Sequence, residues 1–245
     1  CWLDVPLDVQ SAVVDEAELK SYDEQDDRPR WDLAAVRAAC RQIADRLKAA
    51  ARPAILAGNG IHCARAEEAF DELIGSLQIP VALSRSARDL LVSDHPLYCG
   101  RAGIDADRAG NFTIQNADVL LVLGSRLGIR QVSHNWRSFA KNAFVIQVDA
   151  DPAELNKPTV RPNLPVHCDL SVFVSELSSC LAGTEADRRG HSEWLKWCRE
   201  RVGRYPGVLP QQRLAGGVLN PYHFCEYLSR QLADDDVVVC GNGSA

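Results

Sequence analysis

Two arginines follow an apolar run in the middle of the chain. The segment GSRLGIRQVSHN, residues 124–135, comes directly after ADVLLVL and places Arg126 and Arg130 four residues apart. An apolar run that ends at a glycine is typical of a buried strand reaching the surface. Guanidinium groups at that position either pair with surface carboxylates or bind phosphate oxygens through their fixed donors. The pair alone leaves both interpretations open.

A glycine pair follows another apolar run, AILAGNG. Gly58 and Gly60 permit positive φ and close backbone approach, and GNGIHCARAEEAF then opens a helix whose N-terminus favours an anion. The dinucleotide fingerprint G-x-G-x-x-G is incomplete, because Cys63 holds its third glycine position. The pair predicts either a phosphate-binding turn or an ordinary tight turn between strand and helix.

An acidic residue ends a third apolar run, FVIQVD. Asp149 lies where a carboxylate can accept hydrogen bonds from a ribose or an adenine, whereas Asp151, just before Pro152, is expected to cap the helix PAEL. Ligands of parallel α/β sheets bind at the carboxyl ends of the strands. Together with the arginines and glycines, Asp149 therefore favours a nucleotide site. The histidines are scattered, and Ser84 and Ser86 lack an evident His–acid pair.

The elements that position these residues form an alternating pattern. Short apolar runs alternate with amphipathic helices, which predicts an α/β fold with a parallel sheet, a Rossmann-like three-layer domain. The runs lack in–out alternation, as expected of strands covered on both faces. Five strands are expected, in AILAGNG, IPVALS, DVLLVLGSR, AFVIQVDADP and LPVHCDL, whereas LYCGRAGIDADRAG is expected to be a loop.

The pattern divides the chain into five parts. Residues 32–184 form the α/β domain, and the acidic residues 11–31 read as a linker before it. Residues 185–220 read as a second connection that contains the helix HSEWLKWCRERV. Residues 1–10 and 221–245 read as a strand and as a new helix–strand–loop unit, so the chain is expected to be a fragment of a longer polypeptide.

Composition argues against several classes of protein. The net charge of −6 without a basic run does not indicate nucleic-acid binding, and no apolar stretch approaches a membrane span of roughly 20 residues. The nine cysteines are widely spaced without a C-x-x-C pair, which disfavours a zinc site. The odd number and apolar surroundings of the cysteines and the lack of a signal peptide fit the reducing cytoplasm best.

The motifs together resemble a known family. The order GNG…IPVALS…NADVLLVLGSRLGIRQV…FVIQVDADPAELNK…PVHCDL is similar to the central domain of thiamine-diphosphate-dependent enzymes of the acetolactate synthase group. CWLDVPLDVQ resembles the final strand of their pyrimidine-binding domain, and DDDVVVCGNGSA resembles the start of their thiamine-diphosphate-binding domain.

The resemblance implies an enzyme that decarboxylates a 2-oxo acid such as pyruvate and joins the two-carbon unit to an acceptor carbonyl. It also implies thiamine diphosphate with Mg²⁺ as cofactors and a homodimer or homotetramer. The activating glutamate and the magnesium motif of the family lie outside residues 1–245. No catalytic or metal-binding residue is therefore expected in this chain, which is expected to be inactive by itself.

The resemblance also implies that FAD lies along the central domain. The residues expected to face it are Gly58, Asn59, Gly60, Ser84, Arg85, Ser86, Gly103, Ile104, Asp105, Gly124, Ser125, Arg126, Arg130, Val132, Asp149, Ala150 and Asp169, and those expected to approach thiamine diphosphate are Asn242, Gly243 and Ser244.

Two loops depart from the family pattern. Residues 127–129 read Leu-Gly-Ile where the family has Phe-Asp-Asp, and Asp105 stands where a histidine is common. FAD, an ADP-like ligand and no nucleotide at all therefore remain alternatives. Two further hypotheses are a flavin-free 2-oxo acid decarboxylase with a purely structural central domain and an NAD-binding oxidoreductase domain.

Overall fold

Six short strands pair in parallel in the order β3-β2-β1-β4-β5-β6. The computed structural model of the chain describes residues 2–25, 29–182, 191–213, 218–233, 235–239 and 241. The strands are β1 (Pro53–Ala57), β2 (Val81–Leu83), β3 (Tyr98–Arg101), β4 (Val119–Leu123), β5 (Phe144–Asp149) and β6 (Leu164–His167). This order is that of the Rossmann fold, in which the direction of winding reverses between β1 and β4. The predicted α/β class with a parallel sheet is confirmed.

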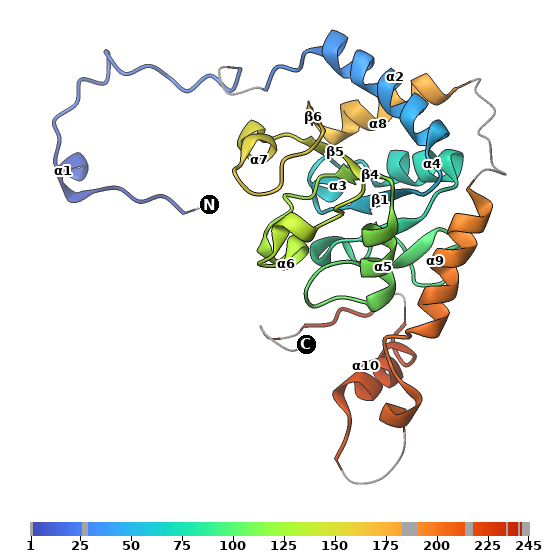
Figure 1. Cartoon of the computed structure of the whole chain (residues 1–245). Coiled ribbons are helices and arrows are strands. Elements are labelled where there is room, and N and C mark those ends of the chain that lie inside the picture. The colour runs from blue at the N-terminus through green and yellow to red at the C-terminus, as the bar shows by residue number, and fades with distance from the viewer. Residues whose placement is uncertain are drawn as a thin grey trace. The chain divides into compact units, whose positions relative to one another are not determined.

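Helices cover both faces of the sheet (Figure 1). On one face α2 (Leu33–Ala49) and α4 (Glu67–Leu77) both contact α8 (Leu170–Leu181). On the other lie α5 (Arg108–Asn116) and the one-turn α6 (Ile129–Val132). The remaining helices are α1 (Leu7–Gln10), α3 (Gly60–Cys63), η1 (Arg85–Ala87), η2 (Trp136–Ser138), α7 (Pro152–Asn156), α9 (Ser192–Arg204), η3 (Pro210–Arg213) and α10 (Pro221–Ser229).

Helix α2 shows how the sequence specifies these elements. Its N-cap, Asp32, accepts a hydrogen bond from the backbone N–H of Ala35 at 3.0 Å. Its buried side chains recur at helical spacing: Val36, Cys40, Ile43 and Leu47. A bidentate ion pair between Arg37 and Glu176 joins α2 to α8.

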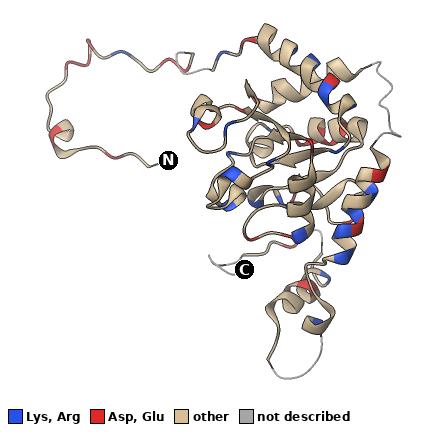
Figure 2. Ribbon diagram, in the orientation of Figure 1, with Lys and Arg blue, Asp and Glu red and all other residues tan. Residues whose placement is uncertain are grey.

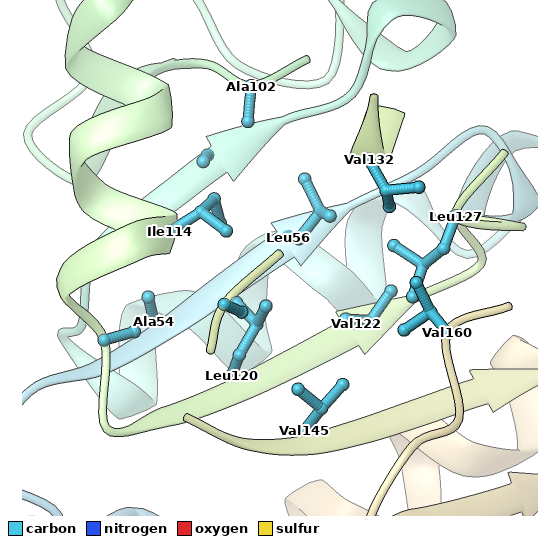
Figure 3. Packing of buried hydrophobic residues seen from close by; sticks show 13 residues of the cluster. Ala54, Leu56, Ala102, Ile114, Leu120, Val122, Leu127, Val132, Val145 and Val160 are labelled. Atoms are coloured by element: carbon cyan, nitrogen blue, oxygen red, sulfur yellow. The ribbon is translucent and has the colours of Figure 1, made fainter. Parts of the chain in front are cut away.

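The core beneath α5 is a cluster of thirteen buried residues (Figure 3). Alternate residues of the strands point into it, including Leu56 of β1, Leu120 and Val122 of β4 and Val145 of β5, and Ile114 of α5 packs above them. Burial of each large side chain contributes roughly 1.5–3 kcal/mol. Every residue of β1, β2 and β4 is buried, which explains their continuous apolar sequences.

The edge strand β3 was expected to be a loop, and that expectation is wrong. Its sequence YCGR holds Gly100 at a φ of +97° and ends in an arginine. Its pairing with β2 shifts register between Val81 and Leu83. Glycine and register shifts are typical of irregular edge strands, and a search for apolar runs passes over them.

Helix α9 lies in the segment interpreted as a second connection, and it packs on the sheet. Trp194 and Cys198 are buried against Cys99 of β3, and the indole Nε1 of Trp194 donates to the Pro53 carbonyl at 2.8 Å. Charged residues recur along this helix (Figure 2). The domain boundaries given above stay predictions, although α9 clearly supports the edge of the sheet.

The strands expected near the two ends of the chain are not formed within the described residues. Residues 1–31 make a separate unit in which residues 2–6 have no regular structure and α1 follows. Residues 235–239 also lack a strand, and Val237 and Val239 are 87% and 91% exposed. A strand requires a neighbouring strand for its backbone hydrogen bonds, and these segments pair with no strand among the described residues. In the described part of the chain, no helix combines the length and apolarity needed to cross a membrane.

Candidate functional site

The loops that follow β1, β2, β4, β5 and β6 line one groove at the carboxyl edge of the sheet. The groove has a volume of about 1870 Å³. It brings together the predicted residues Asn59, Gly60, Ser84, Arg85, Ser86, Gly124, Ser125, Arg126, Arg130, Asp149, Ala150 and Asp169. These residues are dispersed in the sequence, and they meet because parallel strands end at the same edge.

The other predicted residues lie beside the groove or cannot be placed. Gly58 and Val132 support the loops after β1 and β4, and Gly103, Ile104 and Asp105 belong to the loop after β3. None of these five is part of the lining. The three residues expected near thiamine diphosphate, Asn242, Gly243 and Ser244, lie outside the described residues.

Glycines at the exits of β1 and β4 are in backbone contact. The N–H of Gly58 donates to the Leu123 carbonyl at 2.8 Å, and the N–H of Gly60 donates to the Gly124 carbonyl at 2.9 Å. A Cβ atom on Gly60 would lie 2.6 Å from the Cα of Gly124. The N–H of Ile61 also donates to a backbone carbonyl, that of Gly58. The tight-turn interpretation therefore explains the glycine pair, and these three N–H groups are not free to bind an anion.

Three of the four arginines that line the groove, Arg85, Arg126 and Arg130, have a carboxylate partner. Nη1 of Arg130 donates to Oδ2 of Asp105 at 2.6 Å, and Nη1 of Arg85 donates to the same oxygen at 3.1 Å. Nε of Arg126 lies 3.9 Å from Glu154, and its side chain is 76% exposed. The ion pairs of Arg85 and Arg130 are also partly exposed, so they contribute little to stability. All three guanidinium groups thus remain accessible to a ligand.

The acidic residues at the exits of β5 and β6 have distinct local roles. Asp151 caps α7 as predicted, accepting from the N–H of Ala153 at 2.8 Å. Asp169 caps α8, accepting from both the N–H and the hydroxyl of Ser171. Asp149 accepts through Oδ1 from the N–H of Asp151 at 3.0 Å, and no described residue donates to its other oxygen. Burial raises the pKa of Asp149. The bonds to Asp151 and Asp169 also use only Oδ1, so each of the three carboxylates keeps a second oxygen for a ligand.

Lys157 fixes the loop that carries Arg126, and sequence reasoning missed it. Its Nζ donates to the carbonyl oxygens of Arg126 and Leu127 and pairs with Glu154 at 3.0 Å. The Lys157 side chain is only 18% exposed, which is low for a lysine. Its place at the end of DADPAELNK gave no sign of this contact, because the partners are backbone atoms about thirty residues away.

Gln147 supports the same loop from beneath. It is fully buried in β5, and its Nε2 donates to the Ser125 carbonyl at 3.2 Å. Its Oε1 has no hydrogen-bond partner among the described residues. A polar residue inside the apolar run FVIQVD was the sequence signal for this role.

His62 contacts two carboxylates at the rim of the groove. Nδ1 of His62 lies 2.8 Å from Glu67, and Nε2 lies 3.1 Å from Asp89, which lines the groove. The hydrogen bond to Glu67 is the largest cause of the raised pKa of His62. Both ring nitrogens can donate only in the imidazolium form, so this histidine is suited to holding two segments together. Within the described residues, no three His, Cys, Asp or Glu side chains gather to hold a metal ion.

The sheet order and the groove define a Rossmann-like α/β domain with a groove at the point where its winding reverses. Residues 40–177 match the family described as thiamine pyrophosphate enzyme, central domain. The match covers more than half of the chain, and the chain therefore belongs to this family.

The curated relatives that the chain matches are consistent with this family. The chain is 30% identical over 210 residues to the acetolactate synthase isozyme 1 large subunit of Escherichia coli (strain K12), covering 86% of the chain and 35% of that protein. It is 29% identical over 247 residues to the acetolactate synthase large subunit of Corynebacterium glutamicum, with 98% and 38% covered. A third relative, the acetolactate synthase large subunit of Lactococcus lactis subsp. lactis, is 30% identical over 209 residues, with 83% and 34% covered. The chain spans about a third of the length of these relatives.

Proposed function

We propose that this chain supplies the nucleotide-binding central domain of an acetolactate-synthase-like, thiamine-diphosphate-dependent enzyme and that its groove binds FAD. The observation that carries the proposal is the convergence of five strand exits on one groove, with arginines and Asp149 in its lining. Arginine suits a diphosphate because its donors match phosphate oxygens, and a carboxylate suits the hydroxyls of a ribose.

The groove residues fit a nucleotide in charge and in arrangement. Arg126 and Arg130 lie after β4 and are proposed to hold the diphosphate. Asp149 lies after the neighbouring β5, and its unpartnered oxygen is proposed to accept from a ribose hydroxyl. Asn59, Ser84 and the other predicted groove residues are proposed to surround the rest of the ligand.

The proposed reaction is decarboxylation of a 2-oxo acid such as pyruvate, followed by transfer of the two-carbon unit to an acceptor carbonyl. Thiamine diphosphate, held with Mg²⁺ in the complete enzyme, supplies the carbanion chemistry of this reaction. The reaction is redox-neutral, so the proposed role of the flavin is structural. The proposed task of the described residues is to hold the nucleotide, and we propose that the acid and base of the reaction lie elsewhere in the complete enzyme. We also propose that the complete enzyme is a homodimer or homotetramer.

A flavin-free enzyme with a structural central domain is the second candidate. The observation in its favour is that Asp105 already pairs with Arg85 and Arg130. An NAD-binding oxidoreductase domain has less support, because Cys63 interrupts the glycine fingerprint.

The first experiment is a titration of the purified protein with FAD, followed through the visible flavin spectrum. Arg126→Ala is expected to weaken FAD binding about tenfold, the loss of one charge-assisted contact. Arg137→Ala is the matched control, because Arg137 lies beside the ring of Trp136 and outside the groove lining. Absence of bound flavin from the complete wild-type enzyme, with its thiamine-dependent activity preserved, would contradict the FAD proposal.

A further inference from the structure

One carboxylate oxygen joins two arginines from different loops. Oδ2 of Asp105 accepts from Nη1 of Arg130 at 2.6 Å and from Nη1 of Arg85 at 3.1 Å. Arg85 belongs to η1 after β2, and Arg130 belongs to α6 after β4. Both arginines line the groove, whereas Asp105 reaches them from the loop after β3. Two guanidinium groups therefore surround a single anionic oxygen at the groove wall.

The Asp105 carboxylate is held in place by its backbone. The N–H of Ile104 donates to the Arg130 carbonyl at 2.9 Å, and Nε2 of Gln131 donates to the Ala102 carbonyl at 2.9 Å. Gly103 has a φ of +136°, and a Cβ atom there would lie 2.8 Å from the Arg130 carbonyl oxygen. This close approach requires glycine. These contacts fix the loop after β3 against α6 independently of the ion pairs that Asp105 makes.

The far side of the same loop is anchored as firmly. Asn111 of α5 exchanges two hydrogen bonds with the backbone of Gly103, at 3.0 and 2.9 Å. Asp107 accepts from the Nε and Nη2 atoms of Arg101, both at 3.0 Å. Anchors on both sides of Asp105 reduce the conformational entropy lost when it pairs with the arginines. The contact thus differs from an incidental surface ion pair.

We propose that Arg85 and Arg130 form a phosphate subsite of the groove and that Asp105 occupies it as an internal competitor of the nucleotide phosphate. The inference rests on the proposed function of the groove. A carboxylate oxygen and a phosphate oxygen use the same guanidinium donors, so both cannot take them fully at once. The nucleotide must displace Asp105 or bind beside its negative charge. Asp105 therefore lowers the affinity of the groove for phosphate-bearing ligands.

The test is the substitution Asp105→Asn, which removes the charge and preserves the shape of the side chain. Calorimetric titration with ADP is expected to show binding about tenfold tighter than in the wild type, the effect of freeing two partly exposed ion pairs. Inorganic pyrophosphate is expected to show the same tightening, whereas adenosine, which lacks phosphate, is expected to bind unchanged. The gain should shrink as salt is added, because these charges are partly exposed.

The matched control is Asp94→Asn. Asp94 is exposed and lies outside the groove lining. The substitution removes the same charge without freeing the subsite, so ADP binding is expected to change less than twofold. Asp105→Ala serves as a second variant and should tighten ADP binding in the same direction.

The outcomes separate this inference from the proposed function. If the wild type and Asp105→Asn bind ADP equally well, the inference is overturned and the nucleotide groove stands. If neither binds ADP or FAD, both are overturned. Weaker ADP binding in Asp105→Asn also overturns the inference, because the carboxylate would then orient the arginines for the ligand. Equal tightening for ADP and adenosine overturns it too, since the effect would not involve phosphate.

Discussion

A Cβ atom placed on Gly58 would lie 2.3 Å from the carbonyl oxygen of Gly124. The exits of β1 and β4 therefore meet backbone to backbone, at the position where the sheet changes its direction of winding. The groove at this position depends on the contact between Gly58 and Gly124, because this contact sets the distance between the loops after β1 and β4 that form the floor of the groove.

Gly58→Ala is expected to lower the free energy of unfolding by about 3 kcal/mol, because neither backbone can move away without disturbing its strand. Urea denaturation at neutral pH measures the change. Gly75→Ala is the control: Gly75 lies in α4, where an added Cβ meets nothing within 4 Å. Alanine there should raise stability by about 0.5–1 kcal/mol through helix propensity. Equal effects of the two substitutions would contradict the tight contact.

Lys157→Met is expected to weaken FAD binding about tenfold while Arg126 remains in place, because Lys157 holds the carbonyls of Arg126 and Leu127. Titration of the flavin signal measures the loss. Lys141→Met, at an exposed position, is the control and should leave binding unchanged. Unchanged affinity in Lys157→Met would show that the loop needs no such support.

Asp107→Asn is expected to destabilise the protein at pH 7 by about 2 kcal/mol, less than for a fully buried pair because the Arg101 side chain is 38% exposed. Burial alone would raise the pKa of Asp107, but its bonds from Arg101 and Tyr98 outweigh burial and lower it. Because the pKa of Asp107 is lower in the folded state, its ionised carboxylate stabilises the protein above the unfolded-state pKa. This stabilisation is lost as pH falls through the folded-state pKa.

The difference between Asp107→Asn and wild type should therefore shrink steadily below about pH 4. Denaturation curves at pH 7 and at several acidic values check this trend. Glu200→Gln breaks an exposed pair with Arg201 and should change stability by less than about 0.5 kcal/mol at pH 7. A destabilisation by Asp107→Asn that stays constant down to pH 2 would argue that packing, rather than charge, is responsible.

Asp149→Asn is expected to have opposite effects on stability and on binding. Burial raises the pKa of Asp149, so the ionised carboxylate opposes folding. The protonated carboxyl contributes its full stability below the unfolded-state pKa. This contribution is lost as pH rises through the folded-state pKa. Asparagine should therefore raise the free energy of unfolding at pH 7 by less than about 1 kcal/mol, with no gain at pH 3. FAD affinity should fall, because the amide accepts more weakly from a ribose hydroxyl. A variant that is both less stable and fully able to bind FAD would contradict this assignment.

Most of the sheet could be predicted because its inner strands are covered on both faces. VLLVL of β4 is buried at every position and reads as a continuous apolar run. The same reasoning failed for β3, where Gly100 and Arg101 suit an irregular edge. Asp151 could be predicted as a cap because Pro152 follows it, a local signal that needs no tertiary information.

The ion pairs of the groove could not be predicted in the same way. Asp105 meets Arg85 and Arg130 across 20 and 25 residues of sequence. Their meeting depends on the hydrogen bond from the N–H of Ile104 to the carbonyl of Arg130, a contact between two loops. Periodicity and spacing describe single elements, so they carry no information on how two irregular loops fit together.

The position of α9 has a consequence for synthesis on the ribosome. Trp194 closes the beginning of β1 by a hydrogen bond to Pro53 across 141 residues of sequence. At 5–20 residues per second, translation needs roughly 7 to 28 s to produce the intervening 141 residues. During that interval β1 and the edge strand β3 lack their cover, and the nascent chain exposes an open sheet edge to the surrounding cell. Chaperone demand for this protein should therefore be greatest just before residue 194 leaves the exit tunnel.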